Sequence, residues 1–243
     1  MSQPKLGGAR HHHGEPHETG LGGRLNWLRA GVLGANDGLV STAGIVVGVA
    51  GATSTLSTIL TAGIAGLVAG SLSMAGGEYV SVSTQRDTEA AAIAREREEL
   101  ATMPEKEEAE LASIYQERGV SETLAMQVAR ELMARDPLRA HVEAELQIDP
   151  DELTNPWHAA GASFLAFAVG GLVPTLAILV PVGGWRVGVC VAAVIVGLVL
   201  TGDLSARLGS APSRPAIIRN VAVGILTMAI TYLAGKVTGG LVG

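Results

Sequence analysis

Long apolar stretches alternate with short polar breaks along most of the chain. Five stretches are long enough to span the roughly 30 Å hydrocarbon core of a bilayer, with allowance for tilt and polar ends. We expect these membrane-spanning helices near residues 28–50, 56–80, 157–181, 185–206 and 215–237. Turn-forming residues separate neighbouring spans, in the sequences ATSTLS, PVGG and SAPSRP. The pattern predicts an all-α membrane protein with five transmembrane helices.

Residues 86–153 interrupt this pattern and indicate a soluble helical domain inserted between the second and third spans. This segment holds 18 of the 23 acidic residues and 8 of the 17 basic ones, so its formal charge is −10. Pro104 opens one helix, Gly119 ends it, Ser121 caps the next and Pro137 begins the last. No break precedes the segment, so one long helix is expected to run from the membrane into water.

The chain therefore divides into four predicted parts. They are a polar, His-containing tail (1–24), transmembrane helices 1 and 2 (25–85), an acidic helical metal-binding domain (86–153) and transmembrane helices 3 to 5 (154–243). The tail lacks the apolar core of a cleavable signal peptide, so the first span is expected to remain in the membrane. Its HHHGEPHE run can bind metal, or can equally be an expression scar or a disordered tail, and it predicts nothing by itself.

Positive charges predict how the chain crosses the membrane. One side of the spans carries Arg24, Arg29, Arg207, Arg214 and Arg219, and the opposite side has only Arg186 and Lys236. The positive-inside rule then makes the N-terminus and the acidic domain cytosolic and leaves the C-terminus outside. With no targeting signal in the sequence, we expect a multi-pass protein of the cell (inner) membrane.

Small residues dominate the composition: the chain has 32 glycines and is only 3% aromatic. Such residues let membrane helices approach closely, because lipid offers no hydrophobic drive for their association. The single cysteine, Cys190, excludes an internal disulfide framework and a cysteine-based metal cluster within one chain, and is expected to be a packed thiol.

Asp37, in the stretch GANDGLVSTAG, lies near the middle of the first predicted span. The forty residues that follow it, 38–77, contain no Asp, Glu, Lys or Arg. A charge in hydrocarbon costs about 2.5–3.5 kcal/mol, and intramembrane carboxylates are therefore functional by default. The alternative is that Asp37 caps a broken helix or pairs with a cation.

Two stripes of small residues recur at helical spacing on the first two spans. They comprise Gly34, Asp37, Ser41, Gly44 and Gly48 on the first span, and Gly63, Gly66, Gly70, Met74 and Gly77 on the second. If the stripes face each other, they leave a narrow polar path lined by a carboxylate and a thioether. Glu78, at the end of the second span, can collect cations at the cytosolic interface or simply be solvated.

The acidic domain contains a second group of candidate ligands. Two helices each present an E-x-x-E pair, and the last helix adds a His and a Glu four residues apart: Glu96, Glu99, Glu107, Glu110, His141 and Glu145. Such a carboxylate cage suits hard or borderline divalent cations. Glutamates at helical spacing are commonly a solvated face, but charges this close repel unless protons or metal ions offset them.

The stretches GANDGLVSTAGIVVGVAGA and AGIAGLVAGSLSMAGGEYVSVSTQRD, with the Glu-rich helices, closely resemble the vacuolar iron transporter (VIT) family. The similarity runs from about Leu25 to Val237 and is to a bacterial-type member with a cytosolic metal-binding domain. It implies a homodimer with five membrane helices per chain and no tightly bound cofactor. It also implies proton-coupled export of ferrous iron from the cytosol, with manganese as a second substrate in some members.

By position, the resemblance assigns Asp37 and Met74 to the intramembrane metal path. It assigns the cytosolic metal-binding glutamates to Glu96, Glu99, Glu107, Glu110 and Glu145. Two departures stand out. Where some members have a glutamate on the second span, this chain has Gly66, and Glu78 is the candidate replacement. Where the family has a methionine pair on the last helix of the domain, this chain has His141 and Val142. The second change replaces a thioether ligand with an imidazole and so bears on the preferred metal.

Other functions remain open at this point. A membrane-anchored metal buffer or sensor without transport would keep the cage but would not need Asp37 in mid-span, and a channel would need no proton coupling. Dinuclear ferroxidases pair Glu with Glu-x-x-His, which His141 and Glu145 do not match, so we expect no enzyme and no catalytic residues. The expected partners are divalent metal ions, protons, the bilayer and a second copy of the chain, and no nucleic acid.

Overall fold

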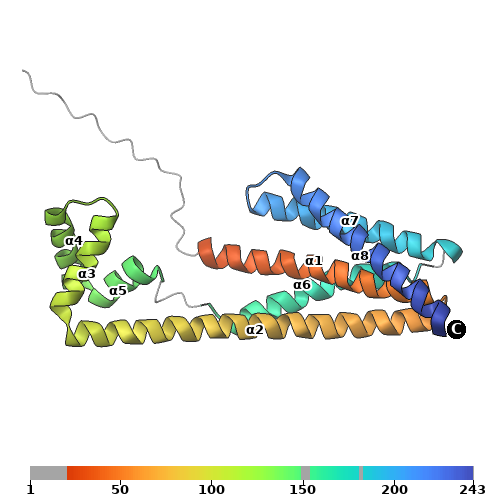
Figure 1. Ribbon diagram of the computed structural model, residues 1–243, viewed down its shortest axis with the longest axis horizontal. Helices are drawn as coiled ribbons and strands as arrows, with labels where there is room; N and C mark the ends of the chain where they lie inside the picture. Colours follow the sequence, from red (N-terminus) through yellow and green to blue (C-terminus); the bar gives the residue numbers. More distant parts are fainter. Residues whose placement is uncertain (1–20, 149–153, 181–182, 243) are drawn as a thin grey trace, which may run out of the picture.

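The computed structural model describes residues 21–148, 154–180 and 183–242, and every regular element within them is helical (Figure 1). The elements are α1 (Leu21–Ala52), α2 (Leu56–Thr102), α3 (Pro104–Glu117), α4 (Glu122–Arg135), α5 (Pro137–His141), the π-helical turn η1 (Val142–Leu146), α6 (Pro156–Ala177), the short 3-10 turn η2 (Gly183–Trp185), α7 (Arg186–Leu208) and α8 (Ser213–Val242). Within these residues, five helices are long and apolar enough to cross a membrane, namely α1, α2, α6, α7 and α8. The predicted five-span, all-α fold is confirmed. The N-terminal histidine run lies outside the described residues.

Helix α1 forms the centre of the membrane bundle and contacts all four other spans. Its buried residues Leu39, Val46 and Val47 join the main apolar core. Glycines let the neighbours come close: a Cβ at Gly38 would overlap the backbone oxygen of Phe167 on α6. Small residues at the crossings thus replace large side chains as the means of close packing, as expected for helices in lipid.

Helix α2 is one continuous helix of 47 residues, as the lack of a sequence break predicts. At 1.5 Å per residue it is roughly 70 Å long, more than twice the thickness of the hydrocarbon core. Figure 1 shows α2 running the length of the molecule, beside the bundle at one end and out to α3, α4 and α5 at the other. The helix therefore carries the acidic segment well away from the membrane spans.

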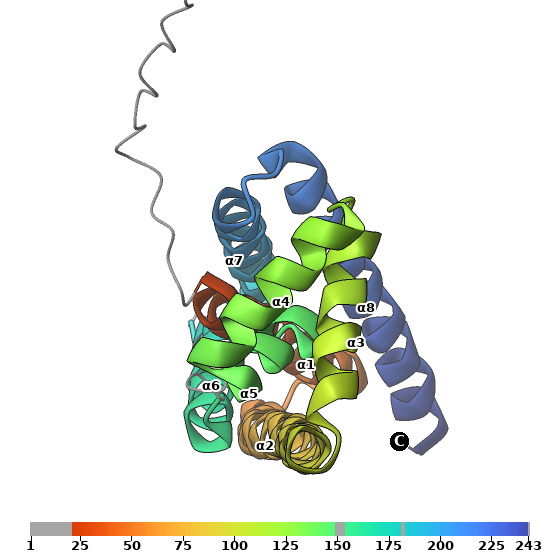
Figure 2. The same ribbon diagram turned by 90° about the vertical axis from the view of Figure 1, so that its left-hand side faces the viewer.

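The acidic segment folds on its own small core at the far end of α2. Leu111 of α3, Ala125 and Ala129 of α4, and Ala140 of α5 are buried together there. Viewed towards that end, α3 and α4 lie in front of the membrane helices (Figure 2). Gly119, with a φ of +93°, lies in the turn between α3 and α4. This left-handed backbone favours glycine, which is why the helix stops where the sequence predicted.

The predicted facing of the two small-residue stripes holds only in part, at Asp37 and Ser41, which share a groove with residues of α2. The small-residue stripe of α1 does not face α2 along its length, because Gly34 lies against Ala166 of α6, and Gly44 and Gly48 lie against Thr231 of α8. The absence of a side chain at these glycines lets α6 and α8 approach more closely than α2 does. Helix α2 stands further from this face, which leaves space beside Asp37.

Candidate metal centre and intramembrane groove

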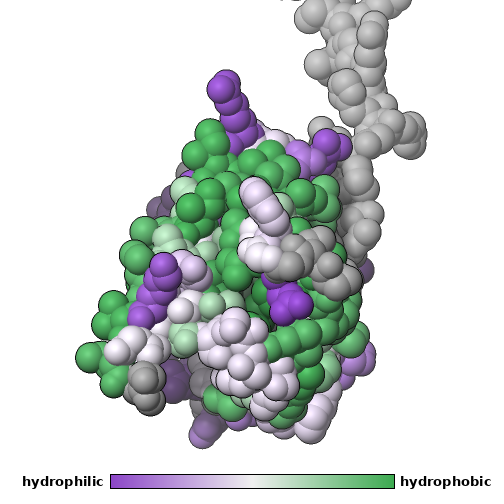
Figure 3. Space-filling view, turned by 90° about the vertical axis from the view of Figure 1, so that its right-hand side faces the viewer, coloured by the Kyte–Doolittle hydropathy of each residue, from purple (hydrophilic) through white to green (hydrophobic). Residues whose placement is uncertain are grey.

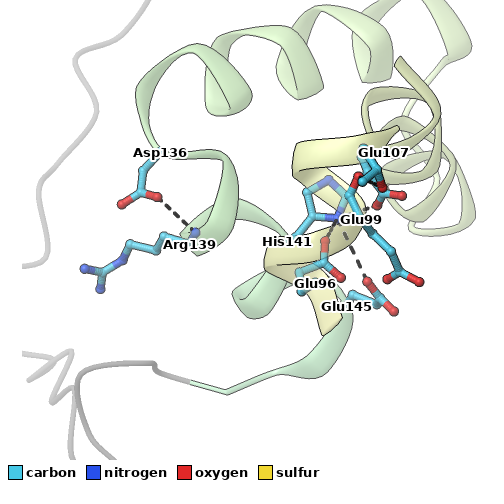
Figure 4. A network of polar contacts seen from close by, with 8 residues as sticks. Glu96, Glu99, Glu107, Asp136, Arg139, His141 and Glu145 are labelled. Carbon is cyan, nitrogen blue, oxygen red and sulfur yellow. Dashed lines mark hydrogen bonds and ion pairs between the residues drawn. The ribbon is translucent and has the colours of Figure 1, made fainter. Parts of the chain in front are cut away.

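Three parts of the chain meet around the imidazole of His141, as Figure 4 shows. The end of α2 that lies beyond the membrane bundle supplies Glu96 and Glu99, the first turns of α3 supply Glu107, and α5 with η1 supplies His141 and Glu145. The turn at Met103 between α2 and α3 folds α3 back so that its carboxylate approaches that of α2. Local sequence thus builds two acidic helices, and the turn brings them to one point.

The distances around His141 are short enough for a shared cation. Its Nδ1 atom lies 2.9 Å from Oε1 of Glu96, 3.7 Å from Oε2 of Glu107 and 3.9 Å from Oε2 of Glu145. One ligand atom each from Glu96, Glu107 and His141 lies within 4.8 Å of the others, and all three residues are buried. A nitrogen and carboxylate oxygens at this spacing are a suitable donor set for a borderline divalent metal.

The buried core of this cage is short of hydrogen bonds. Neither nitrogen of His141 has a hydrogen-bond partner, and Oε1 of Glu96 has none either, because the 2.9 Å contact between them is not aligned as a hydrogen bond. A buried polar group without a partner costs about 1–3 kcal/mol. A cation among these atoms would satisfy the nitrogen and the oxygens together, which is the physical argument for a metal site here.

The electrostatics of the cage agree with its geometry. The pKa of Glu96 is raised from 4.5 to about 7, mainly by burial and also by the charges of Glu145, Glu107 and Glu99. Burial also raises the pKa of Glu107, with Glu110 adding to the shift and His141 opposing it. Without metal, the site therefore holds protons near neutral pH, and a divalent cation would displace them.

The six predicted cage residues divide into a buried core and a more exposed rim. Glu96, Glu107 and His141 are buried, whereas Glu99 is half-buried and Glu110 and Glu145 are exposed. The negative charge of Glu99 helps to raise the pKa of Glu96, and that of Glu110 helps to raise the pKa of Glu107. The rim is where an incoming cation would first meet carboxylates.

The spacing of residues in the sequence did not predict the conformation of the segment that contains Glu145. His141 and Glu145 were expected on one regular helix, but α5 ends at His141 and Glu145 lies in the π-helical turn η1. The carbonyl of Ala144 in this turn accepts a hydrogen bond from Nη2 of Arg118 at 2.6 Å. The Arg118 guanidinium also lies 5.5 Å from the centre of the Tyr115 ring. The local sequence pattern does not predict the hydrogen bond between Arg118 and Ala144, because the two residues are 26 positions apart in the chain.

The other predicted residues meet in an open groove within the membrane bundle. Asp37 of α1 and Met74 and Glu78 of α2 line one groove of about 560 Å³, which is closed on one side by Phe167 of α6. The hydroxyl of Ser41 donates a hydrogen bond of 2.5 Å to Oδ1 of Asp37. The structure therefore brings together the carboxylate, the thioether and the second carboxylate that the sequence singled out.

Gly66 also lines this groove, beside Ile45 of α1. A Cβ at Gly66 would overlap Cδ1 of Ile45 on α1. A side chain at position 66 would therefore require the end of the Ile45 side chain to move. Glu78, three turns further along α2, is the second carboxylate of the groove.

Comparison with known proteins gives a consistent result. The family model described as the VIT family matches residues 28–236. The chain is 41% identical over 223 residues to a vacuolar iron transporter of Acanthamoeba castellanii, an alignment that covers 91% of this chain and 82% of the relative. It is 37% identical over 217 residues to vacuolar iron transporter homolog 3 of Arabidopsis thaliana, covering 89% and 85% of the two chains. It is 38% identical over 222 residues to vacuolar iron transporter homolog 1 of Oryza sativa subsp. japonica, covering 89% and 75%.

Proposed function

The chain belongs to the VIT family, and from this premise we propose that it exports ferrous iron from the cytosol in exchange for protons, with manganese as a second substrate. Members of the family are transporters and not enzymes, so metal transport by a multi-pass membrane protein is the activity of this chain. The names of the relatives support iron as the metal. The metal is the substrate, and no tightly bound cofactor is part of the proposal.

The acidic domain captures the metal. Its rim residues Glu99, Glu110 and Glu145 attract a cation from the cytosol, and the buried core of Glu96, Glu107 and His141 holds it. The unpartnered nitrogens of His141 support this role, since a neutral imidazole is a good ligand for ferrous iron and manganese is well served by the carboxylates.

The path across the membrane follows the groove between α1 and α2. The observation that carries the proposal is the convergence of Asp37, Met74 and Glu78 in that one groove. Helix α2 runs from the bundle to the acidic domain. Of the three groove residues, Glu78 lies nearest to that domain along α2, so a metal ion from the domain meets it first. Met74 and then Asp37 offer successive weak sites of different chemistry.

Proton exchange follows from the same carboxylates. A carboxylate that binds a divalent cation must give up its proton, so protonation and metal binding exclude each other at Asp37 and Glu78. Protons arriving from the opposite side would release the metal from Asp37. Glu78 is the second exchange site, because it is the other carboxylate that lines the groove and position 66 is a glycine.

The proposed assembly is a homodimer in the cell (inner) membrane, with the N-terminus and acidic domain cytosolic and the C-terminus outside. Positive charges on the domain-facing side support the orientation. The groove is open on its outer side, and Ile64, Val68 and Leu72 of α2 are exposed apolar residues. A second copy covering this side would turn the open groove into an enclosed path.

A membrane-anchored metal buffer is the second candidate function. The observation that favours it is that the cage of the acidic domain is complete without any residue of the groove. A buffer would bind metal at the domain and pass none across the membrane. A buffer function would not account for Asp37, a carboxylate inside the bundle that accepts a hydrogen bond from Ser41.

Metal flux into proteoliposomes separates the two functions. Wild type and Asp37→Asn are compared with ferrous iron and with manganese, with and without an imposed pH gradient, and metal binding to the domain is measured in parallel. Asp203→Asn is the matched control, since Asp203 lies outside the groove and pairs with Arg207 at 2.7 Å. Flux that follows the gradient, stops with Asp37→Asn and survives Asp203→Asn supports the transporter. Binding without flux in wild type supports the buffer.

A further inference from the structure

A second groove lies in the membrane bundle, at the end opposite the acidic domain. It has a volume of about 240 Å³ and is lined by Val47 of α1, Val187 and Val191 of α7, and Ile225, Met228 and Tyr232 of α8. In Figure 1 this is the end where α1 and α8 finish and α7 begins. None of these residues belongs to the groove that contains Asp37.

The packing register of α7 and α8 places two cations at the rims of this groove. The two helices run antiparallel, with Gly202 against Ile217 and Leu198 against Gly224. Val187 and Tyr232 both line the groove. Arg186 precedes Val187 in the chain, and Lys236 lies about one turn beyond Tyr232 on α8. Each cation is therefore adjacent to a lining residue, one on each helix.

Within the described residues, neither cation contacts an acidic side chain at this end. The Nε atom of Arg186 is buried and has no hydrogen-bond partner. The Nζ atom of Lys236 lies 5.6 Å from the centre of the Tyr232 ring, which is one wall of the groove. The sequence has no Asp or Glu in residues 38–77, 153–202 or 204–243. A buried guanidinium nitrogen without a partner requires an acceptor, and the groove offers room for one.

The surroundings place this end at the membrane surface. Trp185, next to Arg186, is 78% exposed, as is typical of an aromatic residue at the level of lipid headgroups. Figure 3 looks onto this end of the molecule and shows a mostly hydrophobic face with a few separate hydrophilic patches. A ligand here meets apolar walls below and positive charge at the mouth.

We propose that this groove binds one anionic phospholipid of the surrounding bilayer, with an acyl chain against the apolar wall and the phosphate drawn to Arg186 and Lys236. The apolar wall alone would not select a lipid, since the bilayer interior is equally apolar. Selection comes from the two cations, because juxtamembrane Lys and Arg attract anionic headgroups. The lipid fills the space between α7 and α8 and touches Val47 of α1, the helix that also carries Asp37. This site does not depend on the proposed transport function.

The test measures which lipid stays bound to the full-length protein. The protein is placed in nanodiscs of equal parts phosphatidylglycerol and phosphatidylcholine, and retained lipids are counted by native mass spectrometry. Wild type is expected to retain one phosphatidylglycerol in preference to phosphatidylcholine. The variant Arg186→Gln with Lys236→Gln is expected to lose about fivefold in that preference for each charge removed. Ala229→Phe, which adds bulk on the groove-lining face of α8, is expected to lose the bound lipid although all charges remain.

Arg214→Gln is the matched control, because Arg214 is an exposed arginine at the opposite end of α8. An equal loss with Arg214→Gln would overturn the proposal in favour of general attraction to the protein surface. Retention of phosphatidylglycerol by Ala229→Phe at the wild-type level, or no preference in wild type, would overturn it as well. Helix content by circular dichroism and metal binding by the acidic domain confirm that each variant is folded.

Discussion

At the scale of single residues, His141 stands out in the described part of the chain because two of its buried polar atoms lack hydrogen-bond partners. Its imidazole is fully buried, both ring nitrogens are without hydrogen-bond partners, and three carboxylates surround Nδ1. A neutral histidine in a purely structural role usually donates to a carbonyl or to water. The arrangement at His141 is instead that of a ligand whose cation supplies the missing interaction.

Replacing His141 tests this interpretation. His141→Ala removes the only nitrogen of the cage, and we expect the affinity of the full-length protein for manganese to fall by at least about tenfold. Isothermal titration calorimetry in detergent measures the change. His158→Ala, at an exposed position near the start of α6, is the matched control and should bind as wild type does. Unchanged affinity in His141→Ala would show that the imidazole is structural.

The raised pKa of Glu96 predicts how the metal-free domain responds to pH. The pKa is about 7 in the folded protein against 4.5 for the free side chain, so the folded state binds more protons between these values. The free energy of unfolding therefore falls as pH rises from about 4.5 to about 7, by about 3 kcal/mol at most. Stability is greatest below this window and lowest above it.

Hydrogen exchange of the α3 and α4 amides in the full-length protein, corrected for intrinsic rates, measures this loss. Glu96→Gln should remove most of the pH dependence, since its side chain does not ionise. Saturating manganese should restore protection above pH 7, because the cation binds the ionised carboxylates. Protection that rises with pH in the metal-free wild type would contradict the assignment.

At the scale of elements, the turn η1 decides where the last carboxylate of the cage lies. A π-helical turn is rare and is often found at functional sites. It follows α5 directly, ends at Gln147 in a left-handed conformation, and is tied to the end of α3 by the hydrogen bond from Arg118 to Ala144. Arg118 is therefore a positioning residue for Glu145, although it does not touch the candidate metal site.

Substitution of Arg118 should weaken metal binding without abolishing it. Arg118→Ala frees the Ala144 carbonyl, so Glu145 loses its fixed position, and we expect about a tenfold loss of manganese affinity, with Arg118→Lys recovering part of it. Calorimetry gives the affinity. Arg130→Ala is the control, because its salt bridge to Glu108 lies on the surface and contributes little. Equal losses for both arginines would indicate a general effect of charge.

At the scale of the whole molecule, close helix crossings hold the bundle together. Helix α1 passes between its neighbours at Gly38, where α6 leaves no room for a Cβ atom, and α8 crosses it at Gly235 in the same way. The crossing at Gly38 also holds Phe167 of α6, which lines the groove beside Asp37. The close crossing at Gly38 thus serves both the packing of the bundle and the wall of the candidate metal path.

Two glycine substitutions separate packing from helix propensity. Gly38→Ala places a methyl group on the Phe167 carbonyl and should destabilise the bundle by about 1–3 kcal/mol. Gly76→Ala meets nothing within 4 Å and should be neutral or slightly stabilising. The rate at which maleimide labels Cys190, which is buried in the bundle core, reports opening of the helices. Slow labelling of both variants would show that the α1–α6 crossing tolerates a methyl group.

The sequence by itself determined the number of spans, the acidic insertion and the residues with candidate chemistry. Hydropathy, helix breakers and charge spacing are local properties, so the long helix α2, the stop at Gly119 and the pairing of Glu96 with Glu107 could all be predicted. The tertiary structure alone decided which faces meet, because that depends on backbones brought together from distant parts of the chain. It turned Gly44 and Gly48 towards α8, and it left Asp37 with Met74 and Glu78 in an open groove. It also buried His141 without a partner and tied Arg118 to the turn that carries Glu145, contacts across many residues that no sequence period encodes.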